Sequence, residues 1–294
     1  MDTIPDPKKL RKYNAVQLMD LVNTLRKIII DTLAKGEGHL GSSLGTVELT
    51  IALHYVFNTP RDILIWDVGH QSYSHKMLTG RKKGFEKLRQ QGGISGFPKR
   101  DESPYDPFGT GHAGTSISAV LGMALSAQLN GIKKKHIAVI GDASITNGMA
   151  FEALNHLGTT STNVLIILND NSMGIDPSVG ALKNYFDKVK KGNSGLPNFF
   201  NTLDISYSGP IDGHDLNLLI KSLEIQKNQS GPRLLHVITK KGKGLSFAEN
   251  EQITYHSLGK FDPLTGKLNP VDGKQKIKFQ EVFGKTLTYL LKQN

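Results

Sequence analysis

The sequence predicts an α/β protein with a mostly parallel, twisted sheet and helices on both of its faces. Two observations support this prediction. Short apolar runs, such as 135–140 and 164–168, are typical of strands that are buried on both faces of a parallel sheet. Between them, residues 145–157 show apolar residues at helical spacing. Strands that alternate with helices favour βαβ units, because parallel neighbours need a crossover connection.

The first third of the chain contains two predicted helices and one strand. Apolar residues recur at helical spacing over 15–35, and Gly36 is the expected residue just beyond the helix end. The glycine-rich string GEGHLGSSLG, residues 36–45, is expected to be a loop, and a helix should follow over 47–57. A buried strand over 63–66 leads into the string DVGHQSYSHK, which opens another helix.

The rest of the chain continues this alternation. Residues 80–110 are rich in glycine, lysine and proline and predict a long active-site loop. The small residues of 109–129 predict a glycine loop that enters a deeply buried helix, and 171–210 are expected to be irregular. The remaining expected elements are a helix over 215–226, a strand over 233–239, a loop through 256–272 and a final helix near 279–292.

Composition limits the class of protein. The chain has 294 residues, of which 38% are hydrophobic and 21% charged, as in ordinary globular proteins. No run of apolar residues is long enough to predict a transmembrane helix, and the polar N-terminus lacks the apolar region of a signal peptide. The absence of cysteine excludes disulfides, thiolate zinc sites and cysteine nucleophiles. We therefore expect a cytoplasmic protein with no membrane partner.

The formal net charge of +10 raises the possibility of a nucleic-acid partner. The lysines are scattered in short groups, however, and no interleaved aromatic motif accompanies them. The charge is better interpreted as a basic solvated surface than as a nucleic-acid site. Such a surface also attracts phosphorylated substrates by electrostatic steering.

Two polar side chains follow neighbouring predicted strands at the point where each strand ends. Asp142 comes after the run 135–140, and Asn171, 29 residues later, comes after the run 164–168. Ligands of open α/β sheets bind beyond the carboxyl ends of the strands. Carboxylate and amide oxygens suit Mg²⁺, which often also binds ligand phosphates. The pair predicts a diphosphate cofactor held through Mg²⁺, although Gly-Asp and Asn-Asp pairs also simply end strands.

Several histidines lie in glycine-flanked loops that follow strands or open helices. They are His39, His70 and His112, the last within Gly111-His112-Ala113. Glycine lets backbone N–H groups approach a phosphate closely, and a helix N-terminus favours an anion. A single histidine is more often structural than catalytic, but several in such loops favour an active site.

Read together, these stretches resemble the 1-deoxy-D-xylulose-5-phosphate synthase family of transketolase-like thiamine diphosphate enzymes. The resemblance runs in the family's order from about residue 7 to 270. The strings that distinguish this family from ordinary transketolases are DVGHQ, GDxxI…GMAFEALNH and NDN-x-M. The other matching strings are GHLGSSLGTVELTIALHYVFNTP, GHAGTSIS, GPIDGHD, LLHVITKKGKG and YHSLGKFDP.

The resemblance implies cofactors, substrates and residue roles. It implies thiamine diphosphate and Mg²⁺ as cofactors, and condensation of pyruvate with D-glyceraldehyde 3-phosphate with loss of CO₂, a step toward isoprenoid precursors, thiamine and pyridoxal. The implied metal ligands are Asp142, Asn171 and the carbonyl of Met173. The implied catalytic histidines are His39, His70 and His256. The implied cofactor contacts are His70, Gly111, His112, Ala113, Ala143, Ser144, Asn171 and Leu245.

The chain departs from the family pattern in three ways. The family's Gly-Asp-Gly is Gly-Asp-Ala here, so Ala143 must adopt an ordinary φ. The segment before GPIDGHD is shorter than usual and predicts a mobile insert at about 185–205, clearest over 188–201. The expected domains are a diphosphate-binding domain over 1–275 and a linker with the first helix of a pyrimidine-binding domain over 276–294.

The third departure is the length of the chain. In the family, a complete pyrimidine-binding domain, which supplies a catalytic glutamate, and a C-terminal domain follow, and this sequence contains neither. The resemblance therefore implies that the chain alone is inactive and that the complete enzyme is a homodimer. Two alternatives remain open at this point. The chain could be the N-terminal half of a split transketolase, or a non-catalytic module that only binds Mg²⁺, a diphosphate or another protein.

Overall fold

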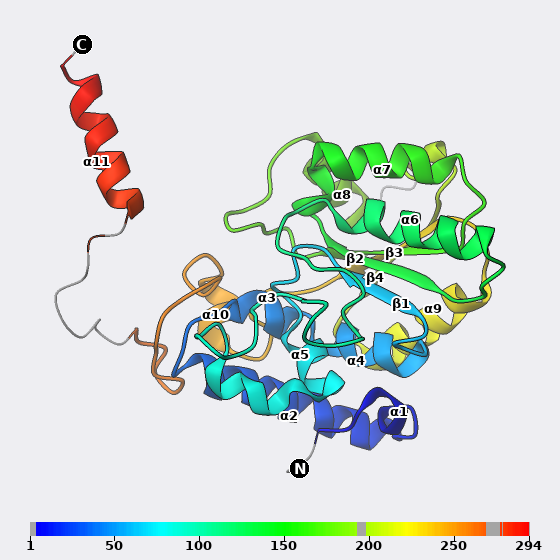
Figure 1. Cartoon of the computed structure of the whole chain (residues 1–294), viewed down its shortest axis with the longest axis horizontal. Helices are drawn as coiled ribbons and strands as arrows, with labels where there is room; N and C mark the ends of the chain where they lie inside the picture. Colours follow the sequence, from blue (N-terminus) through cyan, green and yellow to red (C-terminus); the bar gives the residue numbers. More distant parts are fainter. Residues whose placement is uncertain (1–3, 193–197, 269–276, 278, 294) are drawn as a thin grey trace.

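The computed structural model describes residues 4–192, 198–268, 277 and 279–293. Its centre is a five-stranded sheet in the order β1-β2-β3-β5-β4, in which every neighbouring pair is parallel. Helices cover both faces of the sheet (Figure 1). The predicted fold class is confirmed.

Four strands are buried along almost their whole length. They are β1 Ile63–Trp66, β2 His136–Gly141, β3 Val164–Asp170 and β5 Arg233–Ile238. Successive side chains point to opposite faces, so Ile137 and Val139 enter one hydrophobic core while Ala138 and Ile140 enter the other. Two buried faces explain why these strands read as continuous apolar runs.

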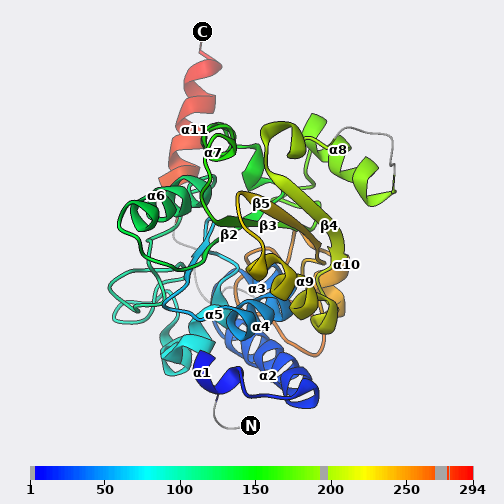
Figure 2. The ribbon, with the colours of Figure 1, turned by 90° about the vertical axis from the view of Figure 1, so that its right-hand side faces the viewer.

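Figure 2 shows the two helical layers from the side. The larger core lies under one layer and the smaller core under the other. The first layer contains α1 Pro7–Leu10, α2 Ala15–Leu33, α4 Val47–Val56 and α9 Leu216–Asn228, and the second contains α6 Ser116–Leu129, α7 Gly148–Gly158 and α8 Ala181–Lys190.

Helix α2 shows how the sequence defines such an element. Asn14 accepts a hydrogen bond from the backbone N–H of Gln17, and the Gln17 side chain accepts one from the backbone N–H of Asn14. This reciprocal cap satisfies two N–H groups that the first turn leaves unpaired. The helix is two residues shorter than the predicted span 15–35: α2 ends at Leu33, and Ala34 caps it in the right-handed conformation. Contrary to the prediction, Gly36 therefore does not directly follow the helix end.

Two other sequence expectations are also wrong. The glycine-rich segment 36–45 contains a completely buried helix, α3 Leu40–Gly45. The segment 171–210 holds α8 and the edge strand β4 Ser206–Asp212, which pairs with β5. Strand β4 is irregular at Gly209-Pro210 and partly exposed, so it lacks the apolar pattern of the other four strands.

The small-residue helix α6 is less buried than expected. Ile117, Val120, Leu121 and Ala124 pack inward, whereas Leu129 is 87% exposed. The helix is amphipathic because it covers the sheet at the protein surface.

Several short helical elements connect the longer ones. They are α5 Tyr73–Lys76, a π-helical turn Met77–Arg81, 3₁₀ turns Lys82–Lys87, Ser144–Thr146 and Asn201–Leu203, and α10 Ser246–Asn250. None of the helices in the described ranges is long and apolar enough to cross a membrane.

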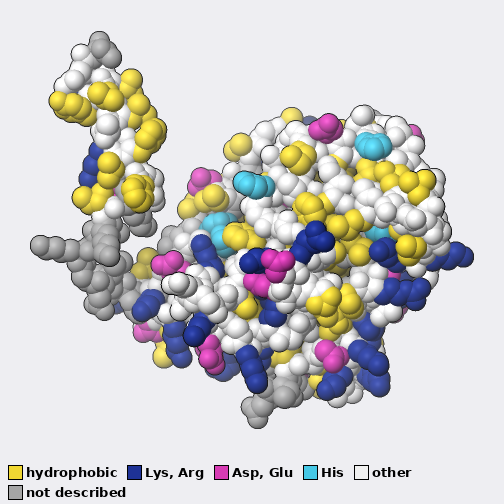
Figure 3. Space-filling model, in the orientation of Figure 1, with side chains coloured by type: hydrophobic (Ala, Val, Ile, Leu, Met, Phe, Trp, Pro, Cys, Tyr) yellow, Lys and Arg dark blue, Asp and Glu magenta, His cyan; other side chains and the backbone are white. Residues whose placement is uncertain are grey.

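The last helix, α11 Phe279–Leu291, begins where the sequence predicts. None of its residues is buried, and its hydrophobic side chains stand in the open (Figure 3). The expected domain boundary at 275–276, the end of the predicted 256–272 loop and residues 193–197 of the expected mobile insert lie outside the described residues. The rest of that insert includes the end of α8 and a 3₁₀ turn.

Candidate active site

The carboxyl ends of β2 and β3 bring Asp142 and Asn171 together. The two strands are parallel neighbours, with Gly141 opposite Asn169. One Asp142 carboxylate oxygen accepts a hydrogen bond from the Asn171 backbone N–H at 3.3 Å, and the other accepts one from the Ser178 hydroxyl at 2.7 Å. The two strand ends therefore share one rim of the sheet, as the sequence predicts.

A cavity of about 390 Å³ opens at this rim. Most of the site residues that the sequence predicts line this cavity. Those in its lining are His39, His70, Gly111, Ala113, Asp142, Ala143, Ser144, Asn171, Met173 and His256. Ala143 has an ordinary φ of −73°, which confirms that the rim loop accepts alanine at this position.

Two predicted cofactor contacts lie elsewhere. His112 is exposed and is not among the lining residues of this cavity. Leu245 is only 8% exposed and packs into the larger hydrophobic core, just before α10.

Three half-buried histidines converge on one side of the cavity. The His39 ring centroid lies 5.3 Å from that of His70 and 5.4 Å from that of His256, and the remaining pair is 5.7 Å apart. The Nδ1 atoms of all three are shielded from solvent and have no hydrogen-bond partner within the described structure. Unpaired buried nitrogens favour a site that a ligand completes, since buried polar atoms are rarely left unsatisfied.

Hydrogen bonds between segments that are distant in the sequence place these histidines. The buried Tyr73 hydroxyl accepts a hydrogen bond from the His39 N–H, and the Ser43 hydroxyl donates to the His70 carbonyl. The Gly41 N–H donates to the Tyr255 carbonyl at 3.0 Å, which holds the loop of His256 against α3. A Cβ at Gly41 would lie 3.0 Å from that same carbonyl, so glycine permits the close approach.

Burial keeps the histidine cluster neutral. Desolvation, followed by the neighbouring His256, lowers the pKa of His39 to about 4. Desolvation and then His39 lower the pKa of His70 to about 3, and desolvation and then Lys241 lower that of His256 to about 4. At neutral pH the three rings are therefore uncharged, and each can accept or donate a hydrogen bond.

The rim provides oxygen atoms for a hard cation. Burial raises the pKa of Asp142 to about 6, and a nearby cation would oppose this shift by stabilising the carboxylate. Asn171 lines the same cavity, and its side-chain oxygen accepts a hydrogen bond from the Met173 N–H at 3.0 Å. No group of three or more His, Cys, Asp or Glu side chains within the described ranges is arranged to hold a metal. A cation here would therefore need amide, carbonyl and ligand oxygens.

Three further residues that the residue-level prediction left out shape this cavity. Asp67 accepts hydrogen bonds from the Gly114 and Ser116 N–H groups, which fixes the turn that carries Ala113. The Phe97 ring lies 5.7 Å from His39. Lys241 donates to the Gly174 carbonyl at 2.7 Å, and burial lowers its pKa to about 8. The position of Lys241 in a polar string directly after β5 could have identified it as a site residue. Phe97 lies in a long loop without periodicity, so the sequence gives no comparable signal for it.

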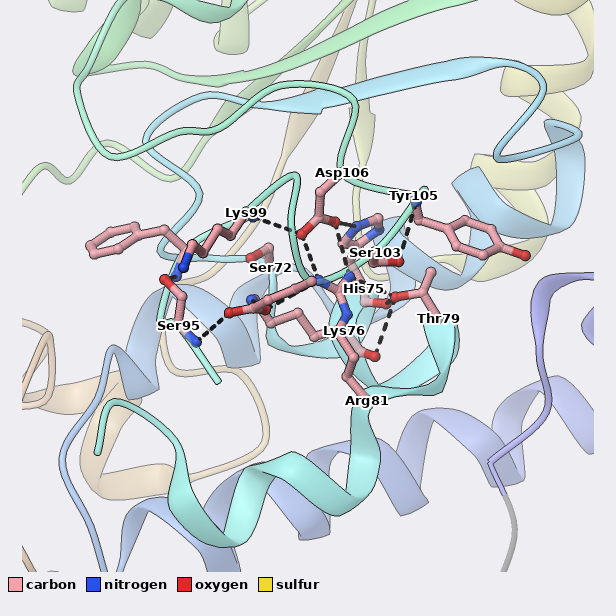
Figure 4. Close-up of polar contacts among 12 residues, drawn as sticks. Ser72, His75, Lys76, Thr79, Arg81, Ser95, Lys99, Ser103, Tyr105 and Asp106 are labelled. Atoms are coloured by element: carbon pink, nitrogen blue, oxygen red, sulfur yellow. Dashed lines mark hydrogen bonds and ion pairs between the residues drawn. The ribbon is translucent and has the colours of Figure 1, made fainter. Parts of the chain in front are cut away.

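A buried polar network anchors the loop that carries Phe97 (Figure 4). Within it, the Asp106 carboxylate accepts hydrogen bonds from His75 Nε2 at 2.8 Å, from the Arg81 guanidinium and from the Lys99 N–H. A second carboxylate of the same loop, Glu102, accepts from the buried Lys76 ammonium and from the backbone N–H of residue 95. The loop therefore folds its own acidic side chains onto cations of the helical segment 73–81.

Comparison with solved structures identifies the class to which this fold belongs. A transketolase from Campylobacter jejuni aligns with 83% of this chain and 41% of its own, with a TM-score of 0.70 and 21% identity. A transketolase from Leishmania mexicana aligns with 87% of this chain, with a TM-score of 0.68 and 20% identity. The chain thus has the transketolase-like α/β fold.

Sequence comparison identifies the family within this class. The family model described as 1-deoxy-D-xylulose-5-phosphate synthase matches residues 1–196 and 192–239. Relatives of that name from Cytophaga hutchinsonii and Dechloromonas aromatica are 48% and 47% identical over 99% of this chain. The chain belongs to the 1-deoxy-D-xylulose-5-phosphate synthase family of transketolase-type transferases. It spans about half the length of these relatives, 52% of each.

Proposed function

We propose that this chain provides the cofactor-binding half of an enzyme that condenses pyruvate with D-glyceraldehyde 3-phosphate and releases CO₂. The main support is the convergence of three neutral histidines beside the Asp142–Asn171 rim in one cavity. The rim supplies oxygen atoms for a cation, and the histidines supply groups that accept and donate protons.

The residues of the cavity fit thiamine diphosphate and Mg²⁺. Asp142, Asn171 and the Met173 carbonyl would hold the metal. Backbone N–H groups of the lining residues Gly111, Ala113, Ala143 and Ser144 would face the diphosphate, and Lys241 would add a positive charge. The unpaired histidine Nδ1 atoms are consistent with a ligand-completed site. When bound, thiamine diphosphate supplies a nucleophilic carbon and then accepts the electrons released by decarboxylation.

The chain's own side chains would then orient the substrates and transfer protons. His39 is central, because its ring contacts both His70 and His256 as well as Phe97. Because their pKa values are depressed, these rings are neutral bases at neutral pH, and each could accept a proton from a substrate hydroxyl or return it. Phe97 would help to exclude water from the reacting atoms.

We further propose that this chain is inactive alone and acts with pyrimidine-binding and C-terminal domains in a homodimeric enzyme. The chain spans about half of its relatives, and α11 presents an exposed apolar surface that a further domain would cover. Large exposed apolar surfaces mark interaction sites.

Two measurements test these proposals. Calorimetry should show that the chain binds thiamine diphosphate only when Mg²⁺ is present. The chain alone should release no product from pyruvate and D-glyceraldehyde 3-phosphate, whereas addition of the complementary half of the Cytophaga hutchinsonii relative should restore turnover. Turnover with a ketose phosphate donor in place of pyruvate would instead indicate a transketolase, and full turnover by the chain alone would contradict the requirement for a partner domain.

A further inference from the structure

A second cavity lies at the opposite edge of the sheet from the candidate active site. Its volume is about 550 Å³. Its lining residues come from the segments that directly precede β1, β2 and β3, from the start of β2, and from the last turns of α6 and α9. Ligands of this fold type bind at the carboxyl edge, so this amino-edge cavity is independent of the synthase site.

The lining of this amino-edge cavity is strongly basic. Five cationic side chains line it, against a single carboxylate: Arg61, Lys133, Lys134, Lys135 and Lys227. The carboxylate, Asp62, is already occupied, because its two oxygens accept hydrogen bonds from the Lys135 and Asn58 N–H groups. None of the five cations forms an ion pair with any residue in the described ranges.

A sixth cation lies directly beside the cavity. Arg233 is 1% exposed and donates to the Asn163 side-chain oxygen at 2.6 Å, and Asn163 lines the cavity. Its other acceptors are the Gly231 and Gln226 carbonyls, so all of these partners are neutral. Buried charges usually have a counter-ion, and this one has none among the residues described.

The remaining groups allow for an organic ligand. Ala124, Ala127 and Ile132 add apolar surface, and Ile132 is 54% exposed. His136 also lines the cavity, and its Nε2 atom has no hydrogen-bond partner in the described structure. In Figure 3, lysine and arginine side chains gather along the right-hand side, where the loops that precede the strands lie in Figure 1.

We propose that this amino-edge cavity binds a small phosphate or diphosphate ester. Several converging cations repel one another, and a polyvalent anion removes that repulsion and replaces the missing counter-ions. The concave shape and the volume of the cavity fit a small molecule, whose phosphate oxygens Lys and Arg can bind by charge-assisted hydrogen bonds. The proposal does not depend on the synthase function, because the two cavities share no lining residue.

Isothermal titration calorimetry with inorganic pyrophosphate, in the absence of Mg²⁺, tests the proposal. We expect saturable binding by the wild-type chain, with one site that survives in Asp142→Ala. The double variant Lys133→Gln/Lys134→Gln should bind at least about tenfold more weakly, because two charge-assisted contacts are lost. The matched control, Lys188→Gln/Lys191→Gln, removes two positive charges from an exposed surface elsewhere and should bind as the wild type does.

Other outcomes would overturn the inference. They are the absence of saturable binding, equal weakening in both double variants, and loss of binding in Asp142→Ala alone, which would place the anion at the carboxyl edge. NMR spectra test whether pyrophosphate binds in this cavity, because the signals of the His136 ring should then shift when pyrophosphate is added. Thermal unfolding of each variant checks that the fold is intact, and phosphate in place of pyrophosphate shows whether one anionic group is sufficient.

Discussion

Replacement of Asp106 by asparagine should markedly destabilise the protein. Asp106 is 3% exposed, and its carboxylate accepts hydrogen bonds from His75, Arg81 and the Lys99 backbone N–H. Asparagine keeps one acceptor oxygen but removes the charge, so the Arg81 guanidinium loses its buried counter-ion and retains Glu102 at 3.5 Å. Removal of one partner of a buried ion pair costs about 3–5 kcal/mol, and we expect the lower end of this range.

The chain contains one tryptophan, which reports on this network. Trp66 is 1% exposed, and its ring lies 6.0 Å from that of His75. Urea unfolding followed by its fluorescence should show a midpoint lowered by about 1 M or more, given a denaturant dependence of roughly 1–3 kcal/mol per molar. The control is Asp101→Asn, an exposed carboxylate of the same loop. A decrease in the free energy of unfolding of less than about 1 kcal/mol, or one equal to that of Asp101→Asn, would refute the reasoning.

The same variant should change the response to acid. Burial alone would raise the pKa of Asp106, but the hydrogen bonds from His75 and Arg81 outweigh burial and hold the pKa well below its usual value. The stability that this depressed pKa provides is fully present above the unfolded-state pKa of about 3.9 and is lost as the pH falls further. The wild type should therefore lose its advantage over Asp106→Asn below about pH 4.

Three other predictions concern the candidate site. Asp142→Ala should abolish Mg²⁺-dependent binding of thiamine diphosphate, and undiminished affinity by calorimetry would exclude it as the metal carboxylate. His39→Asn or His256→Asn should slow turnover of the complemented enzyme by about 10²-fold or more with little change in melting temperature, whereas a large stability loss with intact turnover would indicate a structural role. Gly69→Ala should lower the free energy of unfolding, measured in urea, by at least about 1 kcal/mol, because Gly69 has a φ of +88° and the new Cβ would lie 2.3 Å from Pro98. An unchanged midpoint would show that the loop of Pro98 does not pack tightly against Gly69.

Four of the five strands could be predicted from sequence, whereas strand β4 and the glycine-rich helix could not. Strands β1, β2, β3 and β5 are buried on both faces, so their side chains are apolar without interruption. Strand β4 is partly exposed along its length and contains Gly209-Pro210, so its sequence lacks that signal. Helix α3 has low intrinsic helix propensity and is formed by its surroundings, where Gly41 and Gly45 allow Tyr255 and Lys240 to approach.

The candidate site also has one part that local sequence predicts and another that depends on the folded structure. Asp142 and Asn171 each end a strand, and parallel pairing of β2 and β3 necessarily brings strand ends to one rim, so local sequence predicts their proximity. The histidines 39, 70 and 256 come from loops whose meeting depends on long-range hydrogen bonds such as Gly41 to Tyr255. Their depressed pKa values arise only after this assembly: burial and neighbouring histidines lower those of His39 and His70, and burial and Lys241 lower that of His256. The neutral state that suits these rings to proton transfer is therefore a property of the folded cluster, which no single histidine motif encodes.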